Sequence, residues 1–344
     1  MRHRNLAVLF AAAAVVALAP ALAAGQGETP RTPWGAPDIG GVWDFRSITP
    51  MERPDDLADK EFLTAEEAAR LEQETLARNE ELLNRPASRT TATESVDSGE
   101  NGAPGFYNNF WLDRGTTTVG TRRTSLVVDP PNGRMPPLTP EAEAKQSALR
   151  AAREGVVTHA PTPGGWIEDL GANGLQLRCI TGFNAGPPMT PGGYNNNVQI
   201  FQTENFVALL NEMNHNVRFV PLDGREHVDL PQWTGDSRGR WEGDTLVVET
   251  VSFLRETSFS SGRTDANLHL TERFTRVSPD VLVYEATIDD PTVWTRPWTY
   301  QVPMTFNEQP LYEYACHEGN YGLFNILAGA RAEEAAAMAA EAAK

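Results

Sequence analysis

The sequence predicts a mainly β protein, an antiparallel barrel or sandwich with helices added on its N-terminal and C-terminal sides. Two observations predict this class. In the second half of the chain, short runs rich in β-branched and aromatic residues recur about every 8–12 residues, with Gly, Pro and Asp between them. These runs do not alternate with helical patterns, which disfavours a doubly wound parallel sheet. The 28 Gly and 25 Pro residues supply the turns that such a fold needs.

The first 24 residues predict a secretory signal peptide. Residues 2–4 read Arg-His-Arg, residues 6–19 are apolar, and small residues at 21–24 suit cleavage near Ala23 or Ala24. The apolar run is shorter than the roughly 20 residues that a transmembrane helix needs. The alternative is an apolar N-terminal helix. We therefore expect a periplasmic or secreted protein that has no membrane span once the signal is removed.

Residues 25–105 are expected to form an extended lead-in, a helix and a flexible loop. A short strand is predicted within the lead-in at residues 40–45. Thr64 is a suitable N-cap, and Glu67 completes a capping box three residues later. The helix should therefore begin at Thr64 and end before Pro86.

A β-rich domain is predicted over residues 106–327, followed by an Ala-rich helix over residues 328–344. One helix, residues 139–154, is expected as an insertion in this domain, because Thr139 is an N-cap and Pro140 suits the first helical turn. The strands are expected at residues 116–129, 198–201, 206–210, 217–222, 233–237, 240–242, 245–253, 268–277, 281–288, 298–306 and 311–316, with Asp223-Gly224 as a hairpin turn.

Charge and cysteine content exclude several classes of protein. The 344 residues carry 46 acidic and 29 basic side chains, a formal charge of −17, which disfavours a nucleic acid as partner. No run of like charges concentrates this excess, so it indicates a dispersed, solubilising surface. Two cysteines cannot form a disulfide-dense scaffold or a four-thiolate zinc site. Cys179 and Cys316 are expected either to form one long-range disulfide or to remain two separate thiols.

Long segments of the chain resemble a large group of exported bacterial proteins of unknown function. The resemblance covers nearly all of the chain after the signal peptide, and it implies no established activity. A weaker resemblance, to lipocalin-like barrels, rests on Gly41-Val42-Trp43, a Gly-x-Trp at the start of a first strand. The segments that carry the first resemblance are residues 32–35 with 37–43, residues 233–250 (Trp-Thr-Gly-Asp-Ser-Arg-Gly-Arg-Trp-Glu-Gly-Asp-Thr-Leu-Val-Val-Glu-Thr) and residues 312–321 (Tyr-Glu-Tyr-Ala-Cys-His-Glu-Gly-Asn-Tyr).

A polar interruption between two apolar runs, residues 211–216, is the first candidate site. Glu212 and His215 could form a carboxylate–imidazole pair in which His215 acts as general base. A spacing of three places them on opposite faces of a regular strand, so a bulge or turn is required. The alternative is a hairpin tip whose side chains face water.

Histidines and neighbouring acids are the second candidate. His317 and Glu318 follow Cys316 and could contribute to a pocket or a metal site, whereas Cys316 as a nucleophile would be lost in a disulfide. A divalent metal would require side chains such as His215, His227 and His269 to converge through the fold, since no signature spacing is present.

Aromatic side chains next to asparagine amides form the third candidate site, because such pairs suit a pocket for an aromatic or glycosidic molecule. Three functions follow. The first is binding of a small molecule, the second is a hydrolase, lyase or isomerase that uses the His/Glu pair or a metal, and the third is a structural envelope protein. The sequence predicts neither the ligand nor the oligomeric state. The candidate ligand-binding residues are Asn211, Trp111, Tyr194, Asn196 and Glu318.

Overall fold

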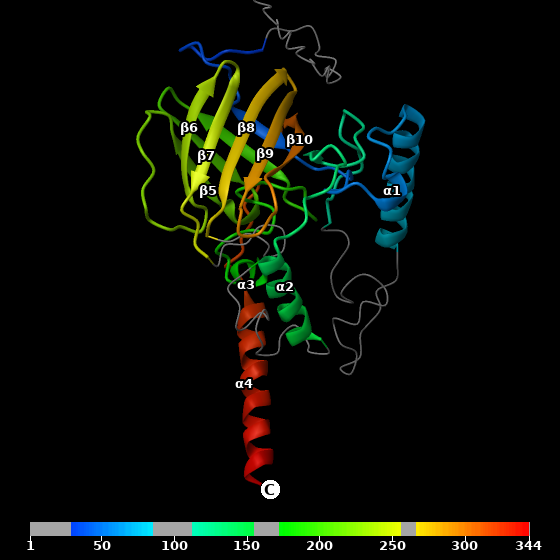
Figure 1. The fold of residues 1–344 in the computed structure, drawn as a ribbon, viewed down its shortest axis with the longest axis vertical. Helices are drawn as coiled ribbons and strands as arrows, with labels where there is room; N and C mark the ends of the chain where they lie inside the picture. Colours follow the sequence, from blue (N-terminus) through cyan, green and yellow to red (C-terminus); the bar gives the residue numbers. More distant parts are fainter. Residues whose placement is uncertain (1–28, 85–111, 155–171, 256–265, 344) are drawn as a thin grey trace, which may run out of the picture.

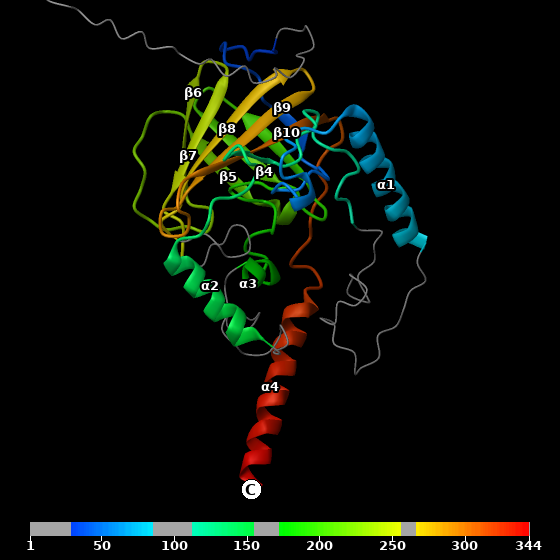
Figure 2. The same ribbon diagram turned by 45° about the vertical axis from the view of Figure 1, so that its right-hand side comes forward.

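The computed structural model describes residues 29–84, 112–154, 172–255 and 266–343 (Figure 1). These residues form a ten-stranded, antiparallel sheet that curls on itself, with the helices outside it (Figures 1 and 2). The predicted class, a mainly β fold with an antiparallel barrel or sandwich, is confirmed. The strands are β1 Gly41–Asp44, β2 Val127–Asp129, β3 Asn197–Gln202, β4 Phe206–Asn211, β5 Val217–Pro221, β6 Asp236–Glu242, β7 Thr245–Val251, β8 His269–Ser278, β9 Val281–Asp289 and β10 Trp298–Asn307.

The strand order is β5-β4-β3-β1-β10-β9-β8-β7-β6, and β2 pairs with β10. The two edge strands, β5 and β6, approach each other without forming a hydrogen-bonded ladder, so the sheet is an open barrel. Gly239 of β6 allows this approach: a Cβ at that position would lie 2.7 Å from both Val220 Cγ1 and Leu222 Cδ2. Such a distance is too short for two carbon atoms, so a larger residue there would push the edges apart.

Alternation of inward and outward side chains builds the core. Burial alternates along most of β8 and β10, and along β9 after Tyr284, as expected for strands with one face on a core. Trp43 of β1 is completely buried, its indole N–H donates to the Ile39 carbonyl at 2.9 Å, and the guanidinium of Arg276 lies 5.1 Å from its ring. The largest fully buried side chains of the barrel are Trp43, Phe274, Tyr284, Trp298 and Tyr300.

The capping motifs start two helices where the sequence predicts. In α1 (Ala65–Asn84), the Glu67 N–H donates to Thr64 Oγ1 at 3.2 Å and the Thr64 N–H donates to Glu67 Oε2 at 2.8 Å. In α2 (Pro140–Arg153), Thr139 Oγ1 accepts from the Ala142 N–H at 3.2 Å. Both helices are confirmed, because a cap is a local interaction.

The C-terminal helix is longer than expected. α4 (Tyr321–Ala342) begins at Tyr321, with Asn320 as its N-cap, rather than at residue 328. It extends away from the barrel (Figures 1 and 2). No helix within the described ranges is both long enough and apolar enough to cross a membrane.

Several expected strands are wrong. Residues 233–237 and 240–242 are not two strands, since β6 continues through Gly239, where the missing side chain fits against β5. Of residues 116–129, only 127–129 pair as a strand. Residues 311–316 form no strand, and Asp223-Gly224 does not join two paired strands, because β5 and β6 are the edges of the sheet. A short helix, α3 (Ala172–Leu177), was not expected.

Candidate functional site

The loops at one end of the barrel hold most of the candidate residues. At this end, here called the α3 end, β1, β4, β7 and β9 finish while β3, β5, β6, β8 and β10 begin. Helices α2 and α3 lie beyond it (Figures 1 and 2). The loop of residues 212–216 joins β4 to β5 there, and residues 182–196 lead into β3.

A disulfide brings a third segment to the same end. Cys179 and Cys316 are bonded, with their Cα atoms 5.8 Å apart, so of the two expected alternatives the disulfide is the one observed. It joins the residues after α3 to the segment before α4. Tyr194 stacks on Tyr314 of this segment, with ring centroids 6.4 Å apart, and meets Phe183 edge-on at 5.3 Å.

Asn196 holds the loop that leads into β3. Its side chain is buried, with Oδ1 accepting from the Gly192 N–H at 2.7 Å and from Asn184 Nδ2 at 3.1 Å. Its Nδ2 donates to the carbonyls of Asp113 at 3.0 Å and Gly192 at 3.2 Å. These bonds occupy the amide, so Asn196 fixes the position of Gly192 in the loop.

Glu212 and His215 lie in one tight loop but do not meet through their side chains. Glu212 Oε2 accepts from Asn197 Nδ2 at 2.8 Å, whereas His215 is exposed and contacts Glu212 only through its backbone N–H, 3.3 Å from the Glu212 carbonyl. Met213 and Asn214 are buried beneath the loop. Asn211 is also buried, and its Oδ1 has no hydrogen-bond partner. The loop has the form of a hairpin tip.

The remaining predicted residues lie apart. His317 and Glu318 are exposed, and His269 is exposed at the start of β8. His227 Nδ1 lies 3.0 Å from Asp236 Oδ2. Within the described parts of the chain, no three His, Cys, Asp or Glu side chains lie together as a metal-binding group. His215, His227 and His269 are therefore not brought together, and Trp111 lies outside the described residues.

Sequence reasoning missed a charged pair inside the barrel. Arg218 of β5 reaches Glu272 of β8 with two hydrogen bonds, one of them 2.9 Å from Nη2 to Oε1, and both residues are buried. Burial alone would lower the pKa of Arg218, but the Glu272 carboxylate outweighs it and raises that pKa. The signal was present, since Glu272 stands between Leu270 and Phe274 on the buried face of its strand.

Two tyrosines connect this pair to the loop at the α3 end. The Tyr284 hydroxyl donates to Glu272 Oε1 at 2.8 Å and accepts from the Met189 N–H at 3.0 Å. The Tyr300 hydroxyl donates to the Met189 carbonyl at 2.6 Å. Burial raises the pKa of both hydroxyls well above the ordinary value. The backbone of buried Met189 thus links its loop to both tyrosines, and these hydroxyl groups find their hydrogen-bond partners within the protein.

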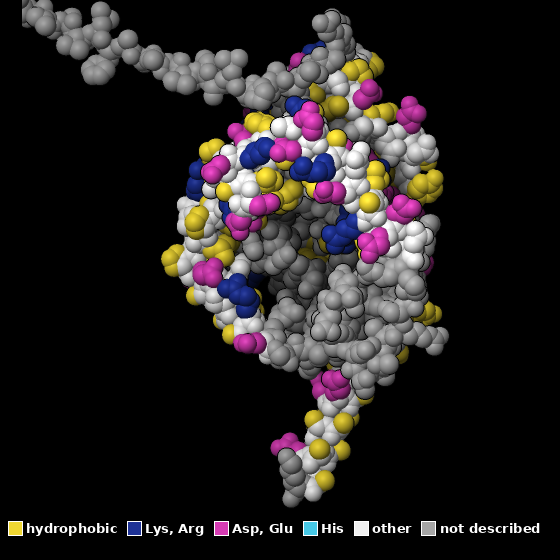
Figure 3. Space-filling view, turned by 90° about the vertical axis from the view of Figure 1, so that its right-hand side faces the viewer, with side chains coloured by type: hydrophobic (Ala, Val, Ile, Leu, Met, Phe, Trp, Pro, Cys, Tyr) yellow, Lys and Arg dark blue, Asp and Glu magenta, His cyan; other side chains and the backbone are white. Residues whose placement is uncertain are grey.

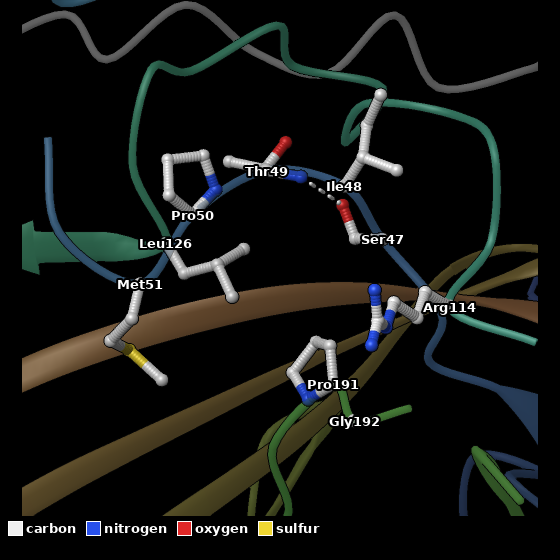
Figure 4. Close-up of a pocket in the computed structure, with 9 residues that line it drawn as sticks. All are labelled: Ser47, Ile48, Thr49, Pro50, Met51, Arg114, Leu126, Pro191 and Gly192. Atoms are coloured by element: carbon white, nitrogen blue, oxygen red, sulfur yellow. Dashed lines mark hydrogen bonds between the residues drawn. The ribbon is translucent and has the colours of Figure 1, made fainter. Parts of the chain in front are cut away.

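An open cavity of about 460 Å³ lies beside Pro191 and Gly192 of the same loop (Figure 4). Its wall residues come from four separate stretches of the chain, residues 47–51, 114, 126 and 191–192, which is why no local pattern revealed it. Leu126 is buried in the core, and its carbonyl accepts from the Gln301 N–H of β10 at 2.9 Å. The Arg114 side chain is directed toward Pro191 and Gly192 across the cavity. The lining is Ser47, Ile48, Thr49, Pro50, Met51, Arg114, Leu126, Pro191 and Gly192.

Figure 3 shows that the face of the molecule on the α1 side is hollowed, with acidic and basic side chains along the described part of its rim.

Comparison of the chain with protein-family models, with curated proteins and with solved structures gives no match. The geometry of the site is therefore the basis for any function assigned to it.

Proposed function

We propose that this protein binds a small organic molecule in the cavity between residues 47–51, Arg114 and Pro191. The observation that carries the proposal is the cavity itself. Its volume of about 460 Å³ lies within the range of about 300–1,000 Å³ typical of small-molecule sites. Ile48, Met51 and Leu126 give it an apolar wall, and a few polar groups stand at its edge, as in most ligand pockets.

The walls are held in place before any ligand arrives. The Ile48 N–H donates to the Thr117 carbonyl at 3.0 Å, and the Leu126 N–H donates to the Pro50 carbonyl at 2.8 Å. On the opposite wall, the Asn196 amide fixes Gly192. A preformed wall lowers the entropic cost of binding, so a ligand need not order these segments.

Export is part of the same proposal. The apolar N-terminal pattern predicts a signal peptide, and the disulfide between Cys179 and Cys316 accords with an oxidising compartment such as the periplasm or the exterior. An enzymatic role on the Glu212 and His215 pair has no comparable support, because the two side chains do not interact.

A neutral fluorescent probe tests the cavity. N-phenyl-1-naphthylamine has an apolar body of suitable size, and its emission rises when it leaves water. We expect saturable binding to the wild-type protein and at least a tenfold weaker affinity in Ile48→Trp, because the indole would fill the cavity. Ile326→Trp is the matched control, since Ile326 is a similarly half-buried isoleucine on α4.

The result is decided by comparing the two variants. Equal probe affinity in the wild type, Ile48→Trp and Ile326→Trp would place the probe elsewhere and refute the proposal. Matching urea unfolding midpoints would show that loss of binding in Ile48→Trp reflects the filled cavity and not a damaged fold.

A further inference from the structure

We infer that the ligand of this cavity is an organic anion, a carboxylate or sulfonate on an apolar body, whose charged group is held by Arg114; this rests on the proposed function. Arg114 is the one charged side chain among the described residues that line the cavity. It is exposed, and its guanidinium extends toward Pro191 (Figure 4). No carboxylate belongs to the described lining.

Among the described residues, no carboxylate forms an ion pair with Arg114. The adjacent Asp113 forms its ion pair with Arg46, which also donates to Asp44 Oδ2 at 2.6 Å. Across the described ranges, no acidic side chain lies within ion-pair distance of Arg114.

A second donor stands on the same side of the cavity. Ser47 Oγ accepts from the Thr49 N–H at 3.1 Å, which orients the hydroxyl group (Figure 4). Its own proton reaches the Thr117 carbonyl only at 3.5 Å, the outer limit of a hydrogen bond. The hydroxyl can therefore turn to a ligand oxygen at little cost. A guanidinium can only donate hydrogen bonds, and the Ser47 hydroxyl already accepts one from the Thr49 N–H. Both groups therefore favour a ligand atom that accepts a hydrogen bond.

The chemistry of these groups selects the ligand class. A guanidinium offers parallel N–H donors that match the two oxygens of a carboxylate or sulfonate, and such charge-assisted bonds are stronger than neutral ones. Ile48, Met51, Leu126 and Pro191 would contact the remainder of the molecule, which must therefore be apolar. A polyphosphate is disfavoured, since only one cation serves the cavity among its described lining residues.

Two probes with the same apolar body separate charge from shape. 8-Anilinonaphthalene-1-sulfonate carries a sulfonate on the anilinonaphthalene skeleton, whereas N-phenyl-1-naphthylamine lacks it. We expect the sulfonate to bind the wild-type protein more tightly than the neutral probe. In Arg114→Gln its affinity should fall about tenfold, as for the loss of a hydrogen bond to a charged group, while the neutral probe changes less than twofold.

Control variants make the comparison specific. Arg331→Gln removes an equal charge from an exposed position on α4 and should leave both probes unchanged. Arg114→Lys should recover part of the affinity for the sulfonate, because a point charge remains without the forked donors. Arg114 is exposed, so its substitution is expected to leave the unfolding midpoint unaltered, which the same urea titration verifies.

The probe affinities of the two variants distinguish failure of this inference from failure of the proposed function. If Ile48→Trp weakens the neutral probe while Arg114→Gln leaves the sulfonate unchanged, the cavity stands and the anion class is overturned. If Ile48→Trp weakens neither probe, the cavity is not the site and both fall. A loss of affinity for both probes in Arg114→Gln also overturns the charge argument, because it would show that Arg114 shapes the cavity.

Discussion

The buried pair of Arg218 and Glu272 gives the sharpest test of how the barrel is held together. Glu272→Gln keeps the shape of the side chain but removes its charge, which leaves the Arg218 guanidinium inside the barrel without a counterion. Arg218 is only 6% exposed and Glu272 is 0% exposed, so water cannot replace the lost partner. Breaking a buried pair in this way costs about 3–5 kcal/mol of the free energy of unfolding.

Removing both charges should have a much smaller effect. In Arg218→Met/Glu272→Leu no ion remains buried, and such replacements range from neutral to about 1–4 kcal/mol more stable. The double variant also deprives the Tyr284 hydroxyl of its acceptor, since that hydroxyl donates to Glu272 at 2.8 Å. This loss costs about 1–3 kcal/mol, so we expect the double variant to stay within about 2 kcal/mol of the wild type.

Urea unfolding followed by tryptophan fluorescence provides the measurement, because Trp43 and Trp298 are completely buried. The wild type, Arg218→Met, Glu272→Leu and the double variant form a thermodynamic cycle. The reasoning is refuted if Glu272→Gln costs less than about 1 kcal/mol, the size of a surface pair. It is equally refuted if the two single costs add up to the cost of the double variant.

Three further predictions concern other parts of the fold. Replacing Cys179 and Cys316 by serine removes a link across 137 positions and should cost about 4–5 kcal/mol on the chain-entropy model, measured as the shift in free energy of guanidinium unfolding; an unchanged midpoint would contradict it. Burial raises the pKa of Tyr284 and Tyr300, so the folded state keeps both protons after the unfolded chain has lost them. Stability should therefore be complete below about pH 10 and fall above it by about 1.4 kcal/mol per pH unit for each tyrosine, and a flat profile between pH 10 and 11 in urea titrations would exclude this. Thr64→Ala removes one half of the capping box and should destabilise α1 by about 1 kcal/mol, seen as faster amide exchange in its first turn, with Thr64→Ser as control.

Local patterns made part of this fold predictable. The capping box of Thr64 and Glu67 and the N-cap at Thr139 act over three residues, so the sequence contains the whole interaction. The runs of β-branched and aromatic residues at 281–288 and 298–306 likewise predicted β9 and β10, because such side chains favour strands.

Interactions between distant segments escaped the same reasoning. Gly239 reads as a break within a strand, yet it continues β6 because Val220 and Leu222 occupy the space its side chain would need. Arg218 meets Glu272 only because the barrel brings β5 across from β8. The cavity likewise draws on four stretches of the chain, residues 47–51, 114, 126 and 191–192, which only the fold brings together.

None of the candidate residues taken from the sequence is among the described residues that line the cavity. The sequence drew attention to residues 194–196 and 211–216, and the fold places both at the α3 end of the barrel. Their chemistry differs from what their composition suggested, because Asn196 bonds Gly192 of its own loop and Glu212 accepts from Asn197 at the start of β3. Arg114 attracted no attention, since a single arginine in a loop has no pattern around it.

The position of β1 has a consequence for how the chain folds. This four-residue strand pairs with β3 on one side and with β10 on the other, and Val42 lies opposite Asn307. Within β3–β5 and within β6–β10, each strand pairs with its neighbour in sequence, so each set can form from local hairpins. The two sets are joined into one sheet only through β1. Joining them must wait until nearly the whole chain has been synthesised, and contacts so distant in sequence form slowly. Without β1, the chain would keep two separate sets of antiparallel strands, β3–β5 and β6–β10. Each set would have one additional unpaired edge, and such edges favour aggregation.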